Sequence, residues 1–586
     1  MFTYRIEEVC FSDSTRITPG PLTVIVGPNN SGKSRALRDI ESLATGSKKT
    51  HLVVTGLQHS LPRSGKELLD AYKVESHTDE SNNVFLRSLS STMTTQHNIH
   101  VGHEWETTLE GFLSTQDANS RATFAAWFGN MFVSMFSTED RLRLIKECDS
   151  AVRGTTENLL QAFYKEGIAA EKSVRAIVGE AFQKDIRLDF SSLRRILLRI
   201  GDDLSSAPVD AREAFDYYEM VDKLDDQGDG IRSFVATVLT LLVGRRPVLL
   251  LDEPEAFLHP PQAFRLGEVL AQQTGTDRQV IVATHSSELL RGILSRRRDV
   301  IIIRVNRTGN TSAIKVLPSD GVASFSSDPL LSSTRILDGL FYKGAIIVEA
   351  DADSVFYQRI GRYLVDADSY HVAHAHNKQT VAKVLGPYRS LDVQYAAIVD
   401  FDVIRVKSEF LALVDQFQFT PSEKSRLDAL RAVIAGYVER VTSAELLASV
   451  LELLRSEITT IESDSRDADS KLTHLLGNLK RVRESGSAWK PYKKAGRAAL
   501  DEGSKAAFDE LSALCAARGL FIVPVGELEG WLVDYGMAHT SNKSKWIVGA
   551  LELLPRLKPD LSTGPWLFLS SVFAYLGKSA GALPSR

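Results

Sequence analysis

Residues 27–34 read Gly-Pro-Asn-Asn-Ser-Gly-Lys-Ser, which is the glycine, lysine and hydroxyl spacing of a phosphate-binding loop. An apolar run precedes this loop and an amphipathic stretch follows it, so a strand and a helix are expected to flank it. Backbone N–H groups of such a loop, with the helix N-terminus behind them, cradle phosphates. Lys33 would reach the β and γ phosphates of ATP, and Ser34 would hold Mg²⁺. The residues predicted to bind ATP here are Gly27, Asn30, Gly32, Lys33 and Ser34.

Two further apolar runs lead into residues that suit nucleotide hydrolysis. Residues 248–251 run into Asp252 and Glu253, as a central parallel strand buried on both faces would. Asp252 would join the Mg²⁺ shell, and Glu253 would polarise the attacking water. A strand within residues 279–290 would place His285 where it could sense the γ-phosphate. Alternatively, His285 is only the polar start of a helix.

Between these motifs, Gly228, Gly230 and Arg232 stand at the start of an apolar helix within residues 225–242. The order of phosphate loop, glycine signature, Asp-Glu strand and switch histidine resembles the ABC-type ATPases, in the branch with SMC-like and recombination ATPases. This resemblance implies a dimer in which the signature residues cap the ATP of the opposite subunit. The signature match is loose, and a plain helix N-cap loop is the alternative. Gln58 is a candidate for the Mg²⁺-contacting glutamine of that family; an ordinary exposed glutamine is the alternative.

A second group of polar residues follows strand-like runs in the other half of the chain: Glu349, Asp353, Asp400 and Asp402. All four offer carboxylate oxygens, which favours Mg²⁺, Mn²⁺ or Ca²⁺. Ligands of parallel sheets bind at the carboxyl ends of strands, and massed carboxylates repel one another unless a cation neutralises them. Asp351, in the same stretch, would instead cap the following helix. Solvated acids at loop edges are the alternative for either pair taken alone.

The acidic spacing resembles a Toprim domain, in which a glutamate follows the first strand and Asp-x-Asp follows the third. Ala350 stands where that family usually has glycine. An ABC-type ATPase followed by a Toprim domain resembles the OLD family of nucleases, which includes the nuclease subunit of the Gabija antiviral system. The resemblance implies that Glu527 and Glu529 help to bind a second metal, and that Lys545, or alternatively Lys543, is catalytic. Taken alone, the glutamates also suit a helix N-terminus, and either lysine suits a surface helix start.

A basic stretch over residues 479–497 is the best local candidate for a nucleic-acid contact. Its basic side chains could neutralise phosphates, while the interleaved Trp489 and Tyr492 stack or pack. The formal net charge of −5 gives the chain no global basic field, so DNA contact must come from such a local patch. A mobile charged linker is the alternative. The candidates for DNA contact are Lys490, Lys493, Lys494 and Arg497.

These motifs require two α/β domains with parallel sheets in the 586-residue chain. The first, residues 1–335, would be an ABC-type P-loop ATPase domain with a helical, dimerisation-type insert over about 45–225. The second, residues 336–586, would be a Toprim domain with a helical and basic insert over about 405–505. Residues 422–464 predict two amphipathic helices. Gly386 and Pro387 predict an early break in a helix that starts at residue 378.

The composition is typical of a soluble globular protein, with 43% hydrophobic and 24% charged residues. The three cysteines form neither a zinc spacing nor a disulfide framework, which fits a reducing cytosol. The N-terminus is too acidic for a signal peptide, and the longest late apolar run is too short and too polar to span a bilayer. We therefore expect a cytoplasmic protein without membrane contact.

The leading hypothesis is an ATP-regulated DNA endonuclease that uses ATP and Mg²⁺, with Mg²⁺, Mn²⁺ or Ca²⁺ at the Toprim site. The OLD resemblance implies a homodimer or larger homo-oligomer, host defence against phage, and work with a second defence protein or a nucleic-acid component. The alternative is an ATPase of DNA repair or signalling whose Toprim domain is degenerate. A topoisomerase would need a tyrosine nucleophile domain, and a primase would need zinc modules that the cysteine count excludes.

Overall fold

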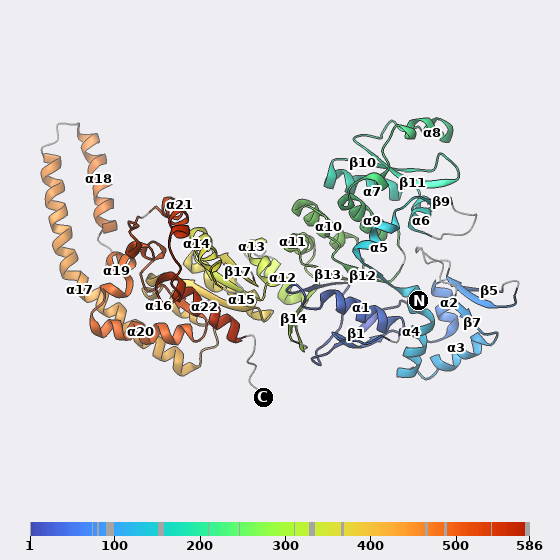
Figure 1. The fold of residues 1–586 in the computed structure, drawn as a ribbon, viewed down its shortest axis with the longest axis horizontal. Coiled ribbons are helices and arrows are strands. Elements are labelled where there is room, and N and C mark those ends of the chain that lie inside the picture. The colour runs from blue at the N-terminus through green and yellow to red at the C-terminus, as the bar shows by residue number, and fades with distance from the viewer. Residues whose placement is uncertain are drawn as a thin grey trace. The chain divides into compact units, whose positions relative to one another are not determined.

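The computed structural model divides the chain into two compact units, Met1–Phe341 and Tyr342–Arg586 (Figure 1). It describes residues 2–47, 49–72, 74–78, 81–88, 99–150, 158–208, 210–244, 246–309, 311–326, 334–364, 369–462, 467–485, 489–540 and 542–579. Within these ranges, no helix combines the length and the apolar character needed to cross a membrane.

The central sheet of the first unit has the strand order β15-β14-β3-β13-β12-β8. Every residue of β3, β12 and β13 is buried, because parallel strands of this kind are covered on both faces. β13 pairs in parallel with both β3 and β12, so these three strands end at one edge. The strands are β3 (Leu22–Val26), β8 (Val133–Phe136), β12 (Val248–Asp252), β13 (Gln279–Ala283), β14 (Val300–Thr308) and β15 (Thr311–Leu317). The helices that follow or flank them are α1 (Lys33–Ala44), α9 (Asp229–Leu242), α10 (Pro260–Gln273), α11 (Ser287–Arg296), α12 (Ser319–Ser326) and α13 (Thr334–Asp338).

The region over residues 45–225, expected to be a helical insert, contains short strands as well as helices. β8 from this region completes the edge of the central sheet beside β12. Short strands like β8 show no clear period among neighbouring helices, which is why the sequence pattern hides them. The other strands of the first unit are β1 (Ile6–Phe11), β2 (Arg16–Ile17), β4 (Val54–His59), β5 (Val74–Thr78), β6 (Val84–Ser88), β7 (Ile99–Val101), β9 (Cys148–Asp149), β10 (Asp185–Asp189) and β11 (Arg195–Gly201). The helices of the insert are α2 (Gly65–Tyr72), α3 (Trp105–Leu113), α4 (Ala118–Phe132), α5 (Thr138–Leu144), α6 (Leu159–Glu166), α7 (Ile168–Phe182) and α8 (Ala211–Glu219).

The second unit is built on a parallel sheet of order β17-β16-β18-β19. A buried aromatic cluster, including Trp546 and Trp566, fills the space between this sheet and its helices. The strands are β16 (Gly344–Val348), β17 (Tyr370–His374), β18 (Gln394–Val399) and β19 (Leu520–Ile522). The helices are α14 (Asp351–Gly361), α15 (Lys378–Ser390), α16 (Lys407–Val414), α17 (Pro421–Glu462), α18 (Ala468–Ser485), α19 (Lys490–Ala495), α20 (Glu502–Ala516), α21 (Lys543–Leu553) and α22 (Gly564–Ser579).

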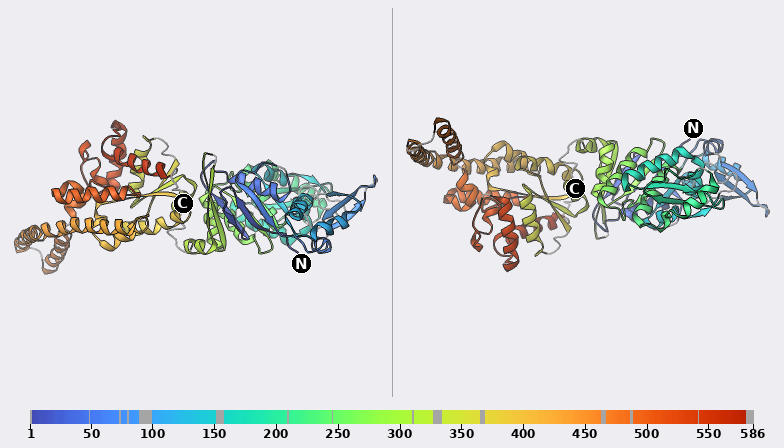
Figure 2. Two further views of the ribbon diagram at one scale, coloured as in Figure 1. Left: turned by 90° about the horizontal axis from the view of Figure 1, so that it is seen from below. Right: turned by 90° about the horizontal axis from the view of Figure 1, so that it is seen from above.

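Two helix predictions for the second unit are wrong. The two amphipathic helices expected over residues 422–464 are one continuous helix, α17, of 42 residues. After its first residue α17 contains no proline, and its single glycine, Gly436, does not interrupt the helix. α15 also continues past Gly386 and carries Pro387 inside its last turn. Figure 2 shows α17 and α18 extending away from the sheet of the second unit.

Candidate active sites

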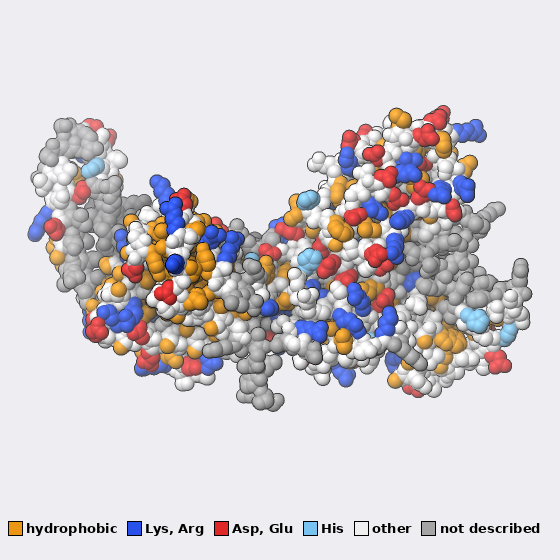
Figure 3. Space-filling view, viewed as in Figure 1, with side chains coloured by type: hydrophobic (Ala, Val, Ile, Leu, Met, Phe, Trp, Pro, Cys, Tyr) orange, Lys and Arg blue, Asp and Glu red, His pale blue; other side chains and the backbone are white. Residues whose placement is uncertain are grey.

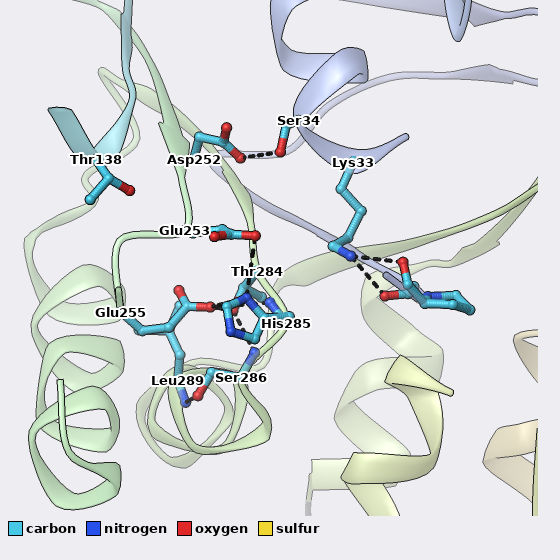
Figure 4. Close-up of polar contacts among 12 residues, drawn as sticks. Lys33, Ser34, Thr138, Asp252, Glu253, Glu255, Thr284, His285, Ser286 and Leu289 are labelled. Carbon is cyan, nitrogen blue, oxygen red and sulfur yellow. Dashed lines mark hydrogen bonds and ion pairs between the residues drawn. The ribbon is translucent and has the colours of Figure 1, made fainter. Parts of the chain in front are cut away.

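Three neighbouring strand ends of the first unit bring the predicted nucleotide-site residues together (Figure 4). β3 ends just before the phosphate loop, β12 ends in Asp252, and β13 ends just before Thr284 and His285. Because β13 lies between the other two strands, the loop and the acidic pair meet beside the histidine. This edge is where open parallel sheets bind ligands.

The phosphate loop adopts a conformation that requires glycine at one position. Gly27 has φ 146°, and a Cβ there would lie 2.1 Å from the carbonyl oxygen of Val305 on β14. Gly32, with φ 104°, is the N-cap residue of α1. Asn30 lies in the left-handed region with φ 61°, which asparagine tolerates better than most residues. The loop therefore turns tightly onto the start of α1.

Lys33 closes the phosphate loop on itself. Its Nζ donates to the carbonyl oxygens of Gly27 and Pro28, each at 2.9 Å. Burial lowers the pKa of Lys33, and the nearby Glu253 and Glu255 oppose that shift. The lysine is thus a buried cation whose partners are two neutral carbonyl groups, which a phosphate oxygen would replace with a stronger, charge-assisted bond.

Ser34 and Asp252 present two oxygen ligands side by side. The Ser34 hydroxyl donates to Asp252 Oδ1 at 2.8 Å. Burial raises the pKa of Asp252, and the hydrogen bond from Ser34 opposes this shift. A hydroxyl and a carboxylate at this spacing fit the oxygen donors that Mg²⁺ takes beside a nucleotide.

Glu253 and His285 form a polar pair beside the phosphate loop. Glu253 has φ 46°, a left-handed conformation for a non-glycine residue. His285 Nδ1 lies 3.3 Å from Glu253 Oε1 and 3.4 Å from Glu255 Oε1. The contact with His285 lowers the pKa of Glu253, while Glu253 raises the pKa of His285. The glutamate is therefore held ionised, as a residue that polarises water must be.

Sequence reasoning missed two residues of this site, Glu255 and Arg141. The buried Glu255 Oε1 accepts from the Thr284 hydroxyl at 2.6 Å and from the His285 backbone N–H at 3.1 Å. The sequence could have indicated Glu255, since this residue stands two positions after Glu253 in the same acidic run. Arg141 on α5 donates to the backbone carbonyls of Asp252 and Glu253, both at 2.7 Å. No local pattern in the sequence marks that arginine.

The signature residues lie at the start of α9. Gly228 is its N-cap residue, and Arg232 in the first turn is paired with Asp229 at 2.9 Å. A Cβ at Gly230 would lie 2.6 Å from the Phe257 carbonyl oxygen, so the helix start packs closely on the loop that follows Glu253. A role for these residues at the ATP of a second subunit stays a prediction.

Gln58, the candidate for a Mg²⁺-contacting glutamine, lies on β4. This strand belongs to a different sheet from the one that carries the phosphate loop. The exposed Gln58 amide donates to Glu8 at 3.4 Å.

Six carboxylates of the second unit gather at the carboxyl edge of its parallel sheet. Glu349 follows β16 directly, and Asp400 follows β18 directly. The Asp400 backbone N–H donates to Glu349 Oε1 at 2.9 Å, which ties the two strand ends together. The other members, which interact electrostatically with these two or with one another, are Asp353 in the first turn of α14, Asp402, Glu527 and Glu529. We call these six residues the acidic cluster.

Burial and mutual repulsion raise the pKa of several cluster members. The pKa of Glu349 rises to about 7, mainly because the residue is buried and partly because Asp402 and Asp353 lie near it. Burial, followed by the charge of Glu349, raises the pKa of Asp400 well above its usual range. Burial also raises the pKa of Asp353 and of Glu529. The cluster thus holds more negative charge than its protein surroundings neutralise.

Lys543, rather than the favoured Lys545, lies among these acids. Lys543 Nζ is 3.7 Å from Asp353 Oδ1 and 3.7 Å from Asp400 Oδ2. Burial lowers the pKa of Lys543, but the surrounding acids outweigh it and raise that pKa overall. Lys545 is exposed, and its backbone N–H donates to the Asn542 side chain at the helix N-cap. Two residues correspond to about 200° around a helix, so only one of these lysines can face the cluster.

Three further cationic or basic side chains contact the cluster. Lys493 Nζ lies 3.5 Å from Glu527 Oε2 and 3.8 Å from Asp402 Oδ2. Lys378 Nζ lies 3.5 Å from Asp402 Oδ2, and His539 Nε2 lies 2.9 Å from Glu527 Oε1. Lys378 and His539 carry no motif that points to this place. Lys493 was expected to contact DNA, and the structure places it at the edge of the acidic cluster.

The expectation that Asp351 caps α14 is wrong. The N-cap residue is Ala350, and Asp353 Oδ2 accepts its backbone N–H at 2.8 Å. Asp351 is exposed instead and lies 3.5 Å from His374 Nε2. Ala350 has φ −133°, an extended conformation that any residue adopts, so alanine in place of the usual glycine causes no backbone strain.

The rest of the basic stretch is divided among several environments. Trp489 and Tyr492 are buried, so their rings pack in the protein instead of being presented to bases. Arg497 makes a two-bond contact with Asp509, at 2.6 and 2.7 Å, and Lys494 is exposed. The side chains of Lys480, Arg481, Arg483 and Lys490 lie outside the described part of the structure. On the face drawn in Figure 3, the described side chains of both charge signs are interspersed.

The donor chemistry of the acidic cluster fits a hard divalent cation. Two buried carboxylate oxygens, Asp353 Oδ1 and Glu529 Oε2, have no hydrogen-bond partner. Oxygen-only donors of this kind suit Mg²⁺, Mn²⁺ or Ca²⁺. Among the described residues, no three Asp, Glu, His or Cys side chains stand ready in a metal-holding arrangement. The ammonium groups of Lys543 and Lys493 lie among the acids instead.

Known proteins similar to the first unit include one family of ATPase domains and several solved structures. Residues 22–291 match a family model described as "AAA domain, putative AbiEii toxin, Type IV TA system". Two SMC head domains are similar in structure, each over 54% of this chain and 98% of theirs. One is bound to the C-winged helix domain of ScpA (13% identity, TM-score 0.32) and the other is from Thermotoga maritima (17% identity, TM-score 0.29).

Two curated relatives are nucleases. The Old nuclease of Escherichia phage P2 is 22% identical over 226 residues, which are 37% of this chain and 35% of the relative. The OLD nuclease of Thermus scotoductus is 25% identical over 195 residues, which are 30% of this chain and 36% of the relative. The chain thus spans about a third of the length of the curated relatives it matches. The predicted resemblance is confirmed at this level: residues 22–291 match the AAA family model, and part of the chain is similar to two OLD nucleases.

Proposed function

We propose that this protein is an ATP-regulated, divalent-metal-dependent DNA endonuclease of the OLD type. The observation that carries the proposal is the acidic cluster, in which loops and helix starts after three parallel strands deliver six carboxylates to one edge of the sheet. The raised pKa values of Glu349 and Asp400 point to a place that is complete only with added positive charge. The similarity to two OLD nucleases supports the same activity.

In the first unit, the phosphate loop would bind the ATP phosphates. Lys33 would exchange its two carbonyl acceptors for phosphate oxygens, and Ser34 and Asp252 would hold Mg²⁺. Glu253, kept ionised by His285, would accept a proton from the attacking water. When the γ-phosphate is released, His285 would change its contacts with Glu253 and Glu255.

In the second unit, the acidic cluster would hold one or two divalent cations. Glu349, Asp353, Asp400 and Asp402 would hold the first, and Glu527 and Glu529 would help to hold the second. Such ions, when bound, supply charge that activates water and clamps the scissile phosphate. Lys543 would turn from Asp353 and Asp400 towards the phosphate and stabilise its developing negative charge.

The proposal extends to the setting in which the enzyme works. A homodimer or larger homo-oligomer would place Gly228, Gly230 and Arg232 at the ATP of a second subunit. Lys494, and Lys490 with it, would contact the DNA backbone. A role in host defence against phage, with a second defence protein or a nucleic-acid component, rests on the resemblance to the OLD family alone.

A second candidate is an ATPase of DNA repair or signalling whose nuclease centre is degenerate. One observation favours it: the described residues hold no ready-made group of three metal ligands. The buried Glu529 Oε2, which has no hydrogen-bond partner, argues for the nuclease, because such an acceptor is costly unless a ligand uses it.

A DNA-cleavage assay separates the two candidates. Plasmid and linear DNA are incubated with Mg²⁺ or Mn²⁺, with and without ATP, using the wild type, Asp400→Ala and Asp351→Asn. We expect cutting by the wild type and by Asp351→Asn, whose exposed carboxylate lies on the same helix as Asp353 but is not placed in the cluster. We expect none above background with Asp400→Ala, while its ATP hydrolysis persists. Equal cutting by Asp400→Ala would remove the acidic cluster as the nuclease centre, and an inactive wild type with intact ATPase activity would favour the second candidate.

A further inference from the structure

Arg141 on α5 is a completely buried arginine that uses every one of its hydrogen-bond donors. A guanidinium group has five N–H donors. Its side chain is 0% exposed. The five acceptors are Ser233 Oγ for Nε (3.1 Å), the Phe136 and Asp252 carbonyls for Nη1 (3.1 and 2.7 Å), and Thr138 Oγ1 and the Glu253 carbonyl for Nη2 (3.2 and 2.7 Å).

Two of the five acceptors of Arg141 lie on the main chain of the acidic pair. None of the five is a carboxylate, so the arginine is not held there by an ion pair. Its two shortest bonds go to the successive carbonyl groups of Asp252 and Glu253. Glu253 has the left-handed φ of 46°, which a side-chain-bearing residue keeps only when its surroundings fix it. Arg141 fixes this conformation, because its two bonds hold the carbonyl groups on either side of the Glu253 φ angle.

Arg141 also joins this turn to the start of α9. Ser233, which accepts from Nε, is buried in the second turn of that helix. Near by, the position of a Cβ on Gly230 would be only 2.6 Å from the Phe257 carbonyl oxygen. The beginning of α9 and the segment from Asp252 to Phe257 are therefore fastened to each other by one arginine and one close backbone contact.

We propose that Arg141 is a positioning residue for ATP hydrolysis: it holds the Asp252–Glu253 main chain in its left-handed turn and keeps that turn in register with α9. The inference rests on the proposed ATPase activity of the first unit. Arg141 touches neither the phosphate loop nor the side chain of Glu253 in any contact described above; it acts through the backbone. A movement at the start of α9 would consequently reach the water-polarising glutamate through this guanidinium.

The test compares steady-state ATP hydrolysis by the wild type, Arg141→Lys and Ser233→Ala. A lysine has three donors, so Arg141→Lys leaves at least two of the five acceptors without their partner. We expect its kcat to fall about ten- to a hundred-fold, the range expected for a small misplacement of a catalytic group, with little change in KM for ATP. Ser233→Ala removes only the Nε acceptor, so its kcat should lie between those of the wild type and Arg141→Lys.

Arg246→Lys is the matched control for loss of a buried arginine. Arg246 lies just before the opposite end of the same strand, β12, and donates to the Val133 carbonyl at 2.9 Å. We expect it to lower the melting temperature without lowering kcat at a temperature where it is folded. An unchanged kcat in Arg141→Lys, or a loss that Arg246→Lys reproduces, would overturn the role of Arg141. A wild type that hydrolyses no ATP would overturn the ATPase proposal itself, which is a different outcome.

Discussion

The phosphate loop and the acidic cluster stand at equivalent edges of two parallel sheets, but they treat charge differently. In the first unit, Lys33 has two carbonyl partners and Asp252 has a hydroxyl donor, so both of these charged side chains have neutral partners before any ligand arrives. In the second, the six carboxylates face the three lysines Lys378, Lys493 and Lys543, and several acids hold raised pKa values. The first site is thus prepared for a phosphate, whereas the second lacks positive charge.

Substitution of Lys33 is expected to have the largest effect on the difference between the two sites. Lys33→Ala removes the one buried cation of the phosphate loop, and we expect ATP turnover to fall about a thousand-fold, as for loss of a preorganised charge at a transition state. Metal-dependent DNA cutting in the absence of ATP should survive, because the acidic cluster lies in the other unit. Lys172→Ala, an exposed lysine of α7, is the control. Unchanged ATP turnover in Lys33→Ala would exclude the phosphate loop as the nucleotide site.

The next largest effect is on DNA cleavage, and it distinguishes the two lysines at the start of α21, Lys543 and Lys545. Lys543→Ala removes the ammonium that lies 3.7 Å from both Asp353 and Asp400, and we expect DNA cleavage to fall about a hundred-fold. Lys545→Ala should cut nearly as well as the wild type, since that side chain is exposed. Initial cleavage rates at saturating Mg²⁺ measure both. The reverse order of effects would return the catalytic role to Lys545.

The smallest effect concerns pH and tests the charge imbalance directly. The pKa of Glu349 is about 7 in the folded protein against a usual 4.5, so the native state binds an extra proton between these values. Stability must then fall as the pH rises from about 4.5 through 7, since the unfolded state has already released that proton. Measured without divalent cations, the wild type should lose roughly 2–6 °C of melting temperature over this window relative to Glu349→Gln.

Added Mg²⁺ should restore the melting temperature more at pH 8 than at pH 5, because only ionised carboxylates attract the ion. The comparison with Glu349→Gln removes the contribution of the titrating groups that do not interact with Glu349. A wild type that gains stability across the window relative to this variant would show that the cluster is not short of positive charge.

The strand ends of both sites could be predicted from the sequence because their signals are local. A buried apolar run followed by Asp252 and Glu253, or by Glu349, carries both the strand and its polar end in fewer than ten neighbouring residues. The spacing of Gly27, Gly32 and Lys33 likewise encodes a loop that β3 and α1 complete.

The remaining features depend on contacts between residues far apart in the chain. Arg141 reaches Asp252 across 111 positions, and no pattern around either residue shows the pairing. The basic neighbours of Lys493 indicated a cation on the surface, but in the folded protein its side chain lies beside Glu527. The choice between Lys543 and Lys545 needed the direction of α21 relative to the acids, which spacing alone does not fix. β8 and the unbroken α17 escaped for a related reason: weak periodicity says little about where a short strand pairs or whether a helix continues.

The continuous helix α17 has a mechanical consequence. With 42 residues at about 1.5 Å per residue, it is about 63 Å long, roughly twice the diameter of a small domain. Its first half is anchored by buried residues such as Leu427 and Ile434, so we expect it to act as a lever with a fixed base. A tilt of about 10° where the anchored half ends would carry the far end through about 5 Å. A small rotation at the base of α17 would thus become a displacement about as large as one turn of a helix at its other end.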